Sequence, residues 1–443
     1  MNESKNVVIK LKSIPGKVIH FNGEGTRINP KVKVAFFTDI LLRDFDGAIK
    51  TMYQLIDRIP EERFEYLFFS GVLPKETLKQ EVIQVPAVST PFNINYKVVL
   101  PEYGRRRLTE ALARFQPDVI HISTPSPLGF FALDYAKKYH IPVLSIYHTH
   151  FLSYMQYYFR GLPFLIPWTE AFVKKMYRKF YNQCDLVYTP TAYITEELKE
   201  CGISGKLLKL WQRGLNLRLF NPGKRDELFI KSLTGNDRPC LLFASRLVWE
   251  KNVETLFRIY EEAEALQLDL NFIIAGSGAA EEEARKRMKK AVFLGFVDPE
   301  TLARVYASCD LFVFTSVSET YGNVVVEAMA SGCVPVIARG GGSQSLVENG
   351  ENGFLCDAED PKDYLTKILR LLNDKKLKER MQSSGYRYTS GLSWERLADA
   401  YFKDIENLAG ENKTASRERG KSLVLRNDRP LSPAKLMSWI SNV

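Results

Sequence analysis

Two glutamates, Glu319 and Glu327, have seven residues between them in the stretch 310–335, DLFVFTSVSETYGNVVVEAMASGCVP. Carboxylates accept hydrogen bonds from sugar hydroxyls but repel phosphate. A helix is expected to begin at Gly322 between them, and the free N–H groups of a helix start bind anions. The combination favours a ligand that carries both phosphates and hydroxyls. The alternative is an ordinary crossover helix whose N-terminal glutamate interacts with the helix dipole.

Two cations, Arg246 and Lys251, follow an expected strand at 240–244. The carboxyl end of a strand is where a phosphate-binding cation is useful, each charge-assisted contact contributing about 1.5–3 kcal/mol. The alternative is a surface pair beside Glu250. Gly276 and Gly278 also follow a strand and would let backbone approach a nucleotide, although a single Gly-x-Gly is weak support.

Histidines and aspartates raise the question of a metal. His148 and His150 have a spacing that suits a metal, but the local sequence offers no third ligand. We therefore expect no metal and interpret His148 as a hydrogen-bonding group at a strand end, facing a cleft; a structural histidine is the alternative. Asp44 and Asp46 form an Asp-x-Asp pattern that holds a metal in some sugar transferases, and we interpret them as turn residues around Gly47.

Apolar strands alternate with helical segments, and this pattern occurs twice, which predicts an α/β protein with two doubly wound parallel sheets. The strands are expected at 31–37, 64–69, 119–122, 143–147 and 186–189, and again at 240–244, 271–275, 292–294, 311–314 and 334–338. The helices are expected at 48–58, 105–115, 129–139, 192–201, 252–266, 279–290, 299–307 and 323–330, with a last amphipathic helix at 393–408.

Turn residues and composition divide the chain. Asn221-Pro222-Gly223 and the charged run after it indicate a domain boundary. We predict an N-terminal extension at 1–30, a first domain at 31–222 plus 393–410, a second at 223–392, and a basic, mobile tail at 411–443.

The cysteine content and the lack of long apolar segments indicate where in the cell the protein is located. The six cysteines of the 443 residues include no Cys-x-x-Cys pair, which favours buried free thiols in a reducing compartment. The N-terminus lacks the apolar core of a signal peptide, and no apolar run is long enough to span a bilayer. We expect a cytoplasmic protein without a transmembrane span.

The net charge of +9 is unevenly distributed, with 25 Lys and Arg against 18 Asp and Glu in residues 31–222. Basic clusters such as Arg105-Arg106-Arg107 could meet nucleic acid, an anionic membrane or an acidic substrate, or could be a solvated helix face. Residues 154–181 interleave aromatic side chains with Lys and Arg, as interfacial segments do. Packing in a core or an acceptor cleft is the other explanation for these aromatics.

Taken together, these motifs resemble the E-x7-E pattern and its partners in the family 4 retaining glycosyltransferases, over about residues 31–410. That family has the GT-B fold, in which two Rossmann-like domains face a cleft and the C-terminal helix crosses back to the first domain. The matching residues are Asp46-Gly47, Tyr147-His148-Thr149, Arg213-Gly214, Phe220-Asn221-Pro222, Ser245-Arg246-Leu247 with Lys251, Gly276-Ser277-Gly278, Gly295-Phe296-Val297, Glu319, Tyr321-Gly322-Asn323, 327–332, Pro335, Asn349-Gly350 and Asn352-Gly353-Phe354.

The resemblance implies a role for each matching position. The expected catalytic set is His148, Glu319, Arg246 and Lys251, in which the two cations neutralise the departing diphosphate without a metal or cofactor, Glu319 contacts the transferred sugar and His148 sits over it. The expected donor-binding set is Gly47, Gly276, Gly278, Phe296, Val297, Tyr321, Gly322, Asn323, Val324 and Glu327, with Glu327 on the ribose and the backbone of Phe296 and Val297 on the base. Ser345 departs from the acidic residue of many relatives, which bears on the donor subgroup.

The resemblance implies a retaining transferase that moves a hexose from a nucleotide-diphosphate sugar, with GDP-mannose favoured over UDP-hexoses, and that does not bind nucleic acid. Its acceptor would be a lipid, a lipid-linked group or another glycan, reached from the cytoplasmic face of an anionic membrane. The alternatives are a nucleotide-sugar epimerase or hydrolase of the same fold, and a non-catalytic nucleotide-sugar or membrane-binding protein.

Overall fold

The computed structural model describes residues 30–43, 45, 47–89, 97–148, 164 and 166–419, together with short strands at β1 (Val8–Ile9), β2 (Ile19–Phe21) and β3 (Arg27–Ile28), which form an antiparallel sheet. Contacts group the described residues into two compact units, one reaching Leu144 and resuming at Lys403, the other Ser145–Phe402. The domain limits expected from the sequence stay predictions. Asp44, Asp46, His150 and residues 154–163 lie outside the described residues.

A seven-stranded sheet is built around β4 (Val32–Ile40), whose middle residues are buried on both faces, as a parallel sheet covered by helices requires. Its order is β12-β11-β10-β9-β4-β5-β6, and β4 pairs in parallel with β5 and β9. The other strands are β5 (Phe64–Val72), β6 (Glu81–Gln84), β9 (Val119–Ile122), β10 (Val143–Ile146), β11 (Leu186–Thr189) and β12 (Leu208–Leu210). The connecting helices are α1 (Gly47–Ile56), α2 (Arg105–Phe115), α3 (Pro127–Tyr139), α5 (Ile166–Tyr181) and α6 (Ala192–Glu200).

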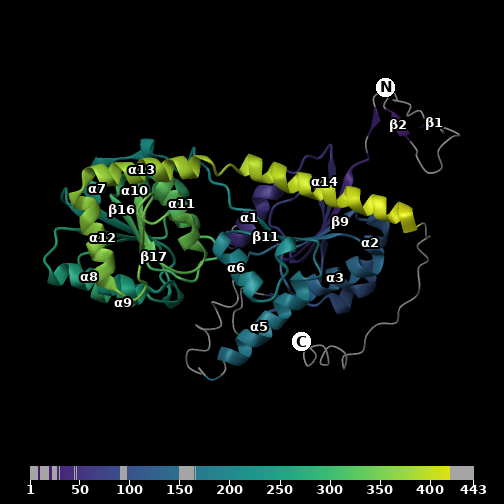
Figure 1. Cartoon of the computed structure of the whole chain (residues 1–443), viewed down its shortest axis with the longest axis horizontal. Coiled ribbons are helices and arrows are strands. Elements are labelled where there is room, and N and C mark those ends of the chain that lie inside the picture. Colours follow the sequence, from purple (N-terminus) through teal and green to yellow (C-terminus); the bar gives the residue numbers. More distant parts are fainter. Residues whose placement is uncertain are drawn as a thin grey trace. The chain divides into compact units, whose positions relative to one another are not determined.

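A six-stranded sheet has the order β15-β14-β13-β16-β17-β18, with all neighbours parallel. Its strands are β13 (Cys240–Ala244), β14 (Asn271–Ala275), β15 (Val292–Gly295), β16 (Leu311–Phe314), β17 (Val334–Ala338) and β18 (Phe354–Cys356). Helices α7 (Glu227–Thr234), α8 (Val253–Ala265), α9 (Glu281–Arg287), α10 (Pro299–Ser308), α11 (Asn323–Ala330), α12 (Pro361–Asn373) and α13 (Lys375–Ser390) surround it (Figure 1). The predicted α/β class with two parallel sheets is confirmed.

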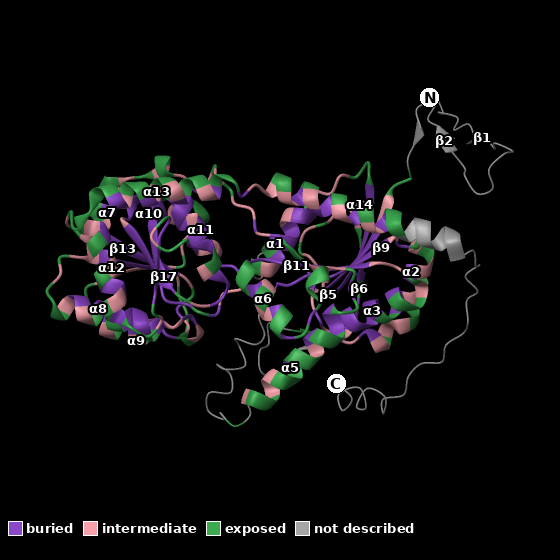
Figure 2. Ribbon diagram, viewed as in Figure 1, coloured by how far each residue is buried: buried purple, intermediate pink, exposed green. Residues whose placement is uncertain are grey.

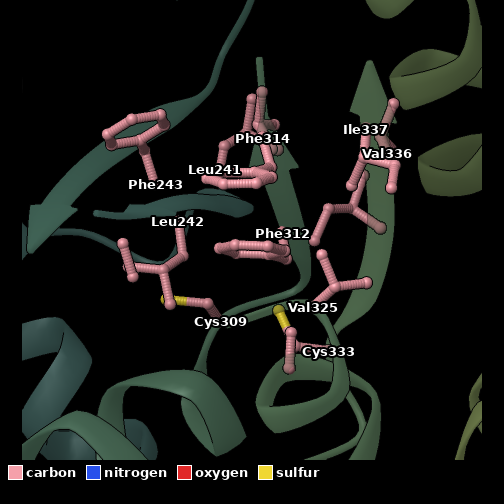
Figure 3. Packing of buried hydrophobic residues seen from close by; sticks show 14 of the residues in the cluster. Leu241, Leu242, Phe243, Cys309, Phe312, Phe314, Val325, Cys333, Val336 and Ile337 are labelled. Atoms are coloured by element: carbon pink, nitrogen blue, oxygen red, sulfur yellow. The ribbon is translucent and has the colours of Figure 1, made fainter. Parts of the chain in front are cut away.

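The core of the second sheet lies under its central strands. Phe312 and Phe314 of β16 stack at 5.7 Å between ring centroids, beside side chains of β13 and β17 (Figure 3). Cys309 and Cys333 lie in the same cluster, and all six cysteines are buried and unpaired, as predicted. Buried residues concentrate on the strands, while the outer faces of the helices are exposed (Figure 2).

The last helix, α14 (Trp394–Arg419), contacts residues that adjoin β5 and β12 of the first sheet. The Trp211 indole N–H donates to the Leu397 carbonyl at 3.0 Å, and Arg63 pairs with Glu406 at 2.8 Å. The helix runs beyond its predicted end at Leu408, because residues 411–419 contain no proline or glycine and several good helix formers.

The sequence did not predict the short elements β6, the antiparallel pair β7 (Ala87–Ser89) and β8 (Lys97–Val99), β12, β18 and α7, nor the longer helices α5, α12 and α13. Brief segments give too few residues for a periodic pattern. Within the described residues, no helix is both long and apolar enough to cross a bilayer.

Candidate functional site

The second sheet has a switch point, where the strand order reverses, between β13 and β16. Ligands of doubly wound sheets bind outside the carboxyl ends of the strands at such a point. The segment after β13 carries Arg246 and Lys251, and the segment after β16 carries Glu319. The fold therefore places the predicted cations and the first glutamate of the pair at the same edge.

Lys251 and Glu319 form an ion pair with 2.6 Å between Nζ and Oε1. Lys251 is 6% exposed and ends the 3-10 helix η5 (Trp249–Lys251), whose position is fixed by the Thr315 hydroxyl donating to the Lys251 carbonyl at 3.2 Å. Burial alone would raise the pKa of Glu319, but the charge and hydrogen bond of Lys251 outweigh it, so the pKa lies below the usual range. The site therefore presents a cation, Lys251, and an anion, Glu319, to a ligand that carries both negative charge and hydrogen-bond donors.

Arg246 differs from Lys251 because its side chain is 62% exposed, with Nη2 3.4 Å from Glu250 Oε1. The loop that carries Arg246 packs against the glycine segment that follows β14. A Cβ on Gly276 would lie 2.0 Å from the Ser245 carbonyl oxygen, and one on Gly278 2.4 Å from that of Leu247. In this structure both glycines therefore permit close packing against the Arg246 loop.

The start of α11 supplies the predicted anion site. Gly322 precedes it with φ +96°, and a Cβ there would lie 2.8 Å from the Ser343 Cβ. No described side chain caps this helix, so the N–H groups of the first turn, at Asn323 and Val324, have no side-chain acceptor. Such a start favours a phosphate or another anion.

Arg213 was not in the set of site residues expected from the sequence, although Arg213-Gly214 was one of the matching motifs. It is buried, its Nη1 lies 3.5 Å from Asn323 Oδ1, and its guanidinium lies 5.6 Å from the ring centre of Tyr321. The Tyr321 hydroxyl donates to the Arg213 carbonyl at 3.3 Å. The only indication in the sequence was an arginine before a glycine, Arg213-Gly214, in a connecting segment. Its contacts with Tyr321 and Asn323 could not be predicted from that motif.

Glu327 lies on α11 and accepts a hydrogen bond from the Tyr306 hydroxyl of α10 at 3.4 Å. Tyr306 is another residue that the sequence did not indicate, because an aromatic residue on the apolar face of a helix is expected to pack in the core. After β15, Phe296 is 88% exposed, whereas Val297 packs against the core of the second sheet. An exposed aromatic at a strand's carboxyl end is suitable for contact with a ligand.

His148 follows β10 and is 5% exposed, and its Nε2 atom has no hydrogen-bond partner among the described residues. Burial, reinforced by the positive charge of Arg213, lowers the pKa of His148 to about 3. The imidazole is therefore neutral at physiological pH and can donate or accept a hydrogen bond.

Gly47 begins α1, where the Thr51 hydroxyl donates to its carbonyl at 2.9 Å. Ser345 accepts a hydrogen bond from the Tyr193 N–H at 3.1 Å. In the described part of the chain, no three His, Cys, Asp or Glu side chains are grouped so that they could hold a metal ion.

Two family models match successive parts of the chain. Residues 45–219 match the model described as Glycosyltransferase Family 4, and residues 224–388 match Glycosyl transferases group 1. A GDP-mannose-dependent alpha-mannosyltransferase of Corynebacterium glutamicum is 27% identical over 83% of this chain and 86% of that protein. A sulfoquinovosyl transferase of Arabidopsis thaliana is 32% identical over 73% of this chain, which spans 62% of that protein.

Solved structures share the fold at low identity. Sucrose-phosphate synthase of Thermosynechococcus elongatus superposes with a TM-score of 0.68 at 19% identity, covering 86% of this chain and 100% of that one. The Anabaena protein HepE, solved with UDP and glucose, gives a TM-score of 0.62 at 18% identity, covering 85% and 99%. The two-domain fold predicted from the sequence is confirmed.

Proposed function

Because this chain belongs to glycosyltransferase family 4, we propose that it transfers a hexose from a nucleotide-diphosphate sugar to a hydroxyl group with retention of configuration. The observation that carries the proposal is the Lys251–Glu319 pair at the switch point of the second sheet, next to the α11 start. We assign donor binding to residues 223–392, and acceptor binding to residues 31–222 with 393–410.

The expected reaction follows from these groups. The bond between the sugar C1 and the phosphate oxygen breaks, and Lys251, Arg246 and the α11 N–H groups stabilise the negative charge that develops on the diphosphate. The acceptor oxygen forms the new bond to C1 on the same face, and its proton passes to the departing phosphate oxygen. Glu319 and neutral His148 form hydrogen bonds with the sugar hydroxyls. Gly47 has no side chain and therefore lets the substrates approach the backbone closely. Glu327 accepts hydrogen bonds from the ribose hydroxyls.

We assign GDP-mannose as the donor, on the similarity to GDP-mannose-dependent relatives of three organisms. A thermal-shift screen of GDP-mannose, UDP-glucose and UDP-galactose, with and without magnesium, tests this assignment and the proposed independence of metal. A larger shift with either UDP-sugar, or a shift only with magnesium, would contradict it.

The site is tested by two substitutions with different expected outcomes. Lys251→Ala should weaken GDP binding, because it removes the cation beside the diphosphate. His148→Ala should reduce mannosyl transfer more than GDP binding, because His148 is assigned to the sugar. Donor breakdown without any glycoside product would instead select a hydrolase, and unchanged transfer in both variants would refute the site.

The acceptor is proposed to be a lipid or lipid-linked group at an anionic membrane, on the cytoplasmic face. Helix α5 supports this, because it carries many exposed residues (Figure 2). Trp168 is 81% exposed and Phe172 is also exposed, next to exposed Lys175 and Lys179. Aromatic and basic side chains on one helix face are typical of interfacial binding. An alpha-monoglucosyldiacylglycerol synthase of Streptococcus pneumoniae, 24% identical over 70% of this chain, is named for a lipid product.

Sedimentation with vesicles of phosphatidylglycerol and phosphatidylcholine at low salt tests the membrane assignment. Lys175→Glu with Lys179→Glu should abolish binding, whereas the charge-matched control Lys375→Glu with Lys376→Glu, on exposed positions of α13, should not. Equal binding by both variants, or none by the wild type, would contradict the role of α5.

A further inference from the structure

The first sheet has its own switch point, between β4 and β9, and the half-buried Asp39 lies there. Phe37 of β4 and Ile122, the last residue of β9, are register partners, and Asp39 and Thr124 lie two residues further along the chain from each. The Thr124 hydroxyl donates to Asp39 Oδ2 at 2.7 Å. The other carboxyl oxygen, Oδ1, is buried without a hydrogen-bond partner in the described part of the chain.

In the described part of the chain, hydroxyl groups and closely packed backbone surround Asp39. Burial raises the pKa of Asp39, and the neighbouring hydroxyl groups of Thr124 and Ser126 oppose this rise; of the two, only Thr124 lies within hydrogen-bonding distance of the carboxyl group. Ser126 caps α3, accepting from the Gly129 N–H at 3.2 Å. A Cβ on Gly71 of β5 would lie 3.2 Å from the Asp39 carbonyl oxygen, so the neighbouring strand packs closely against this backbone.

A buried carboxyl oxygen without a partner costs free energy, and it indicates a group that gains its hydrogen bond from a ligand. The two switch points have different chemistry. That of the second sheet offers a cation, Lys251, and suits a phosphate, whereas that of the first offers a carboxyl group and a hydroxyl. A carboxylate repels phosphate, and its oxygens accept hydrogen bonds from alcohols.

We propose that Asp39 is a specificity-determining residue for the acceptor, its Oδ1 accepting a hydrogen bond from one hydroxyl group of a polyol such as a sugar. Thr124 holds the carboxyl group in place through Oδ2. The inference rests on the proposed transferase function and adds to it a residue that recognises the acceptor.

The test is mannosyl transfer by the full chain from saturating GDP-mannose to octyl α-D-mannopyranoside and its four monodeoxy derivatives. Wild type should lose about tenfold in kcat/KM with one derivative, the one that lacks the recognised hydroxyl. Asp39→Asn places an amide N–H donor at Oδ1 with little change of shape. It should raise the acceptor KM about tenfold and become insensitive to that same deoxygenation, with GDP affinity unchanged.

The matched control is Asp118→Asn. Asp118 accepts a hydrogen bond from the Lys33 N–H at 2.9 Å. It precedes β9 and therefore lies at the amino end of the strands, away from the end where Asp39 lies. The control variant should keep the wild-type acceptor KM and the wild-type deoxygenation profile. Normal transfer by Asp39→Asn with the full deoxygenation penalty would overturn the assignment of Asp39 alone. Absence of product from wild type with every donor and acceptor tried would overturn the proposed function and this inference together.

Discussion

The Lys251 ammonium lies 2.6 Å from the Glu319 carboxylate, joining the segment after β13 to the segment after β16 across the switch point of the second sheet. Neither group needs a ligand to be neutralised, so the site is preformed. A donor would place its diphosphate beside the cation and its sugar hydroxyls beside the anion. Each group would keep a favourable partner, which explains why a buried ion pair is compatible with binding.

Removing one member of this pair should destabilise the protein. Lys251→Met leaves the Glu319 carboxylate partly buried without its cation, and the expected loss is about 3 kcal/mol in the free energy of unfolding. Urea denaturation at pH 7 measures it. The double variant Lys251→Met with Glu319→Gln should recover most of that loss without recovering GDP affinity. A single variant as stable as wild type would show that the pair contributes little.

The same pair predicts how stability depends on acidity. The folded pKa of Glu319 lies below the ordinary value of 4.5, so the pair stabilises the protein fully above pH 4.5. That stabilisation should be lost as the pH falls below 4.5 through the folded pKa. Urea denaturation between pH 3.5 and 7 should show the wild type losing more stability than Glu319→Gln in the acidic range. Parallel curves would contradict the lowered pKa.

His148 should give a separate pH dependence at higher pH. Its pKa is 6.5 in an ordinary setting and about 3 in the folded protein, so only the unfolded chain takes up this proton between those values. Stability should therefore fall as the pH drops below 6.5, by up to about 1.4 kcal/mol per pH unit. His148→Gln should flatten the curve between pH 5 and 6.5, where Glu319 is still ionised. An unchanged slope would mean that another group causes it.

The sequence predicted several elements with the limits that the structure shows, including strands of only a few residues. The limits of α2, β9, β13, β16 and α11 agree with the structure, since each combines an apolar pattern with clear turn or cap residues at its ends. The short strand β18 and the polar helix α13 were not predicted. Their formation depends on packing against β17 and α11, which is tertiary information.

The site was predicted in part. The placement of Arg246, Lys251 and Glu319 at one sheet edge follows from strand order, and strand order follows from the alternating pattern. The ion pair itself could not be predicted, because it depends on how η5 brings Lys251 toward Glu319. Asp39 was overlooked because a single aspartate at a strand end is common in sequences, and its unpartnered oxygen is visible only in three dimensions.

The loop that carries Arg246 should depend on Gly276. Gly276 has φ +130°, and a Cβ there would lie 2.0 Å from the Ser245 carbonyl oxygen. Gly276→Ala should therefore shift this loop, lower the free energy of unfolding by about 1–3 kcal/mol and weaken GDP binding. Gly235→Ala is the control, because Gly235 has φ +73° with open space around it and ends α7. It should cost about 1–2 kcal/mol through backbone strain alone. GDP affinity by calorimetry separates the two variants: equal affinity in both would show that Gly276 does not position Arg246.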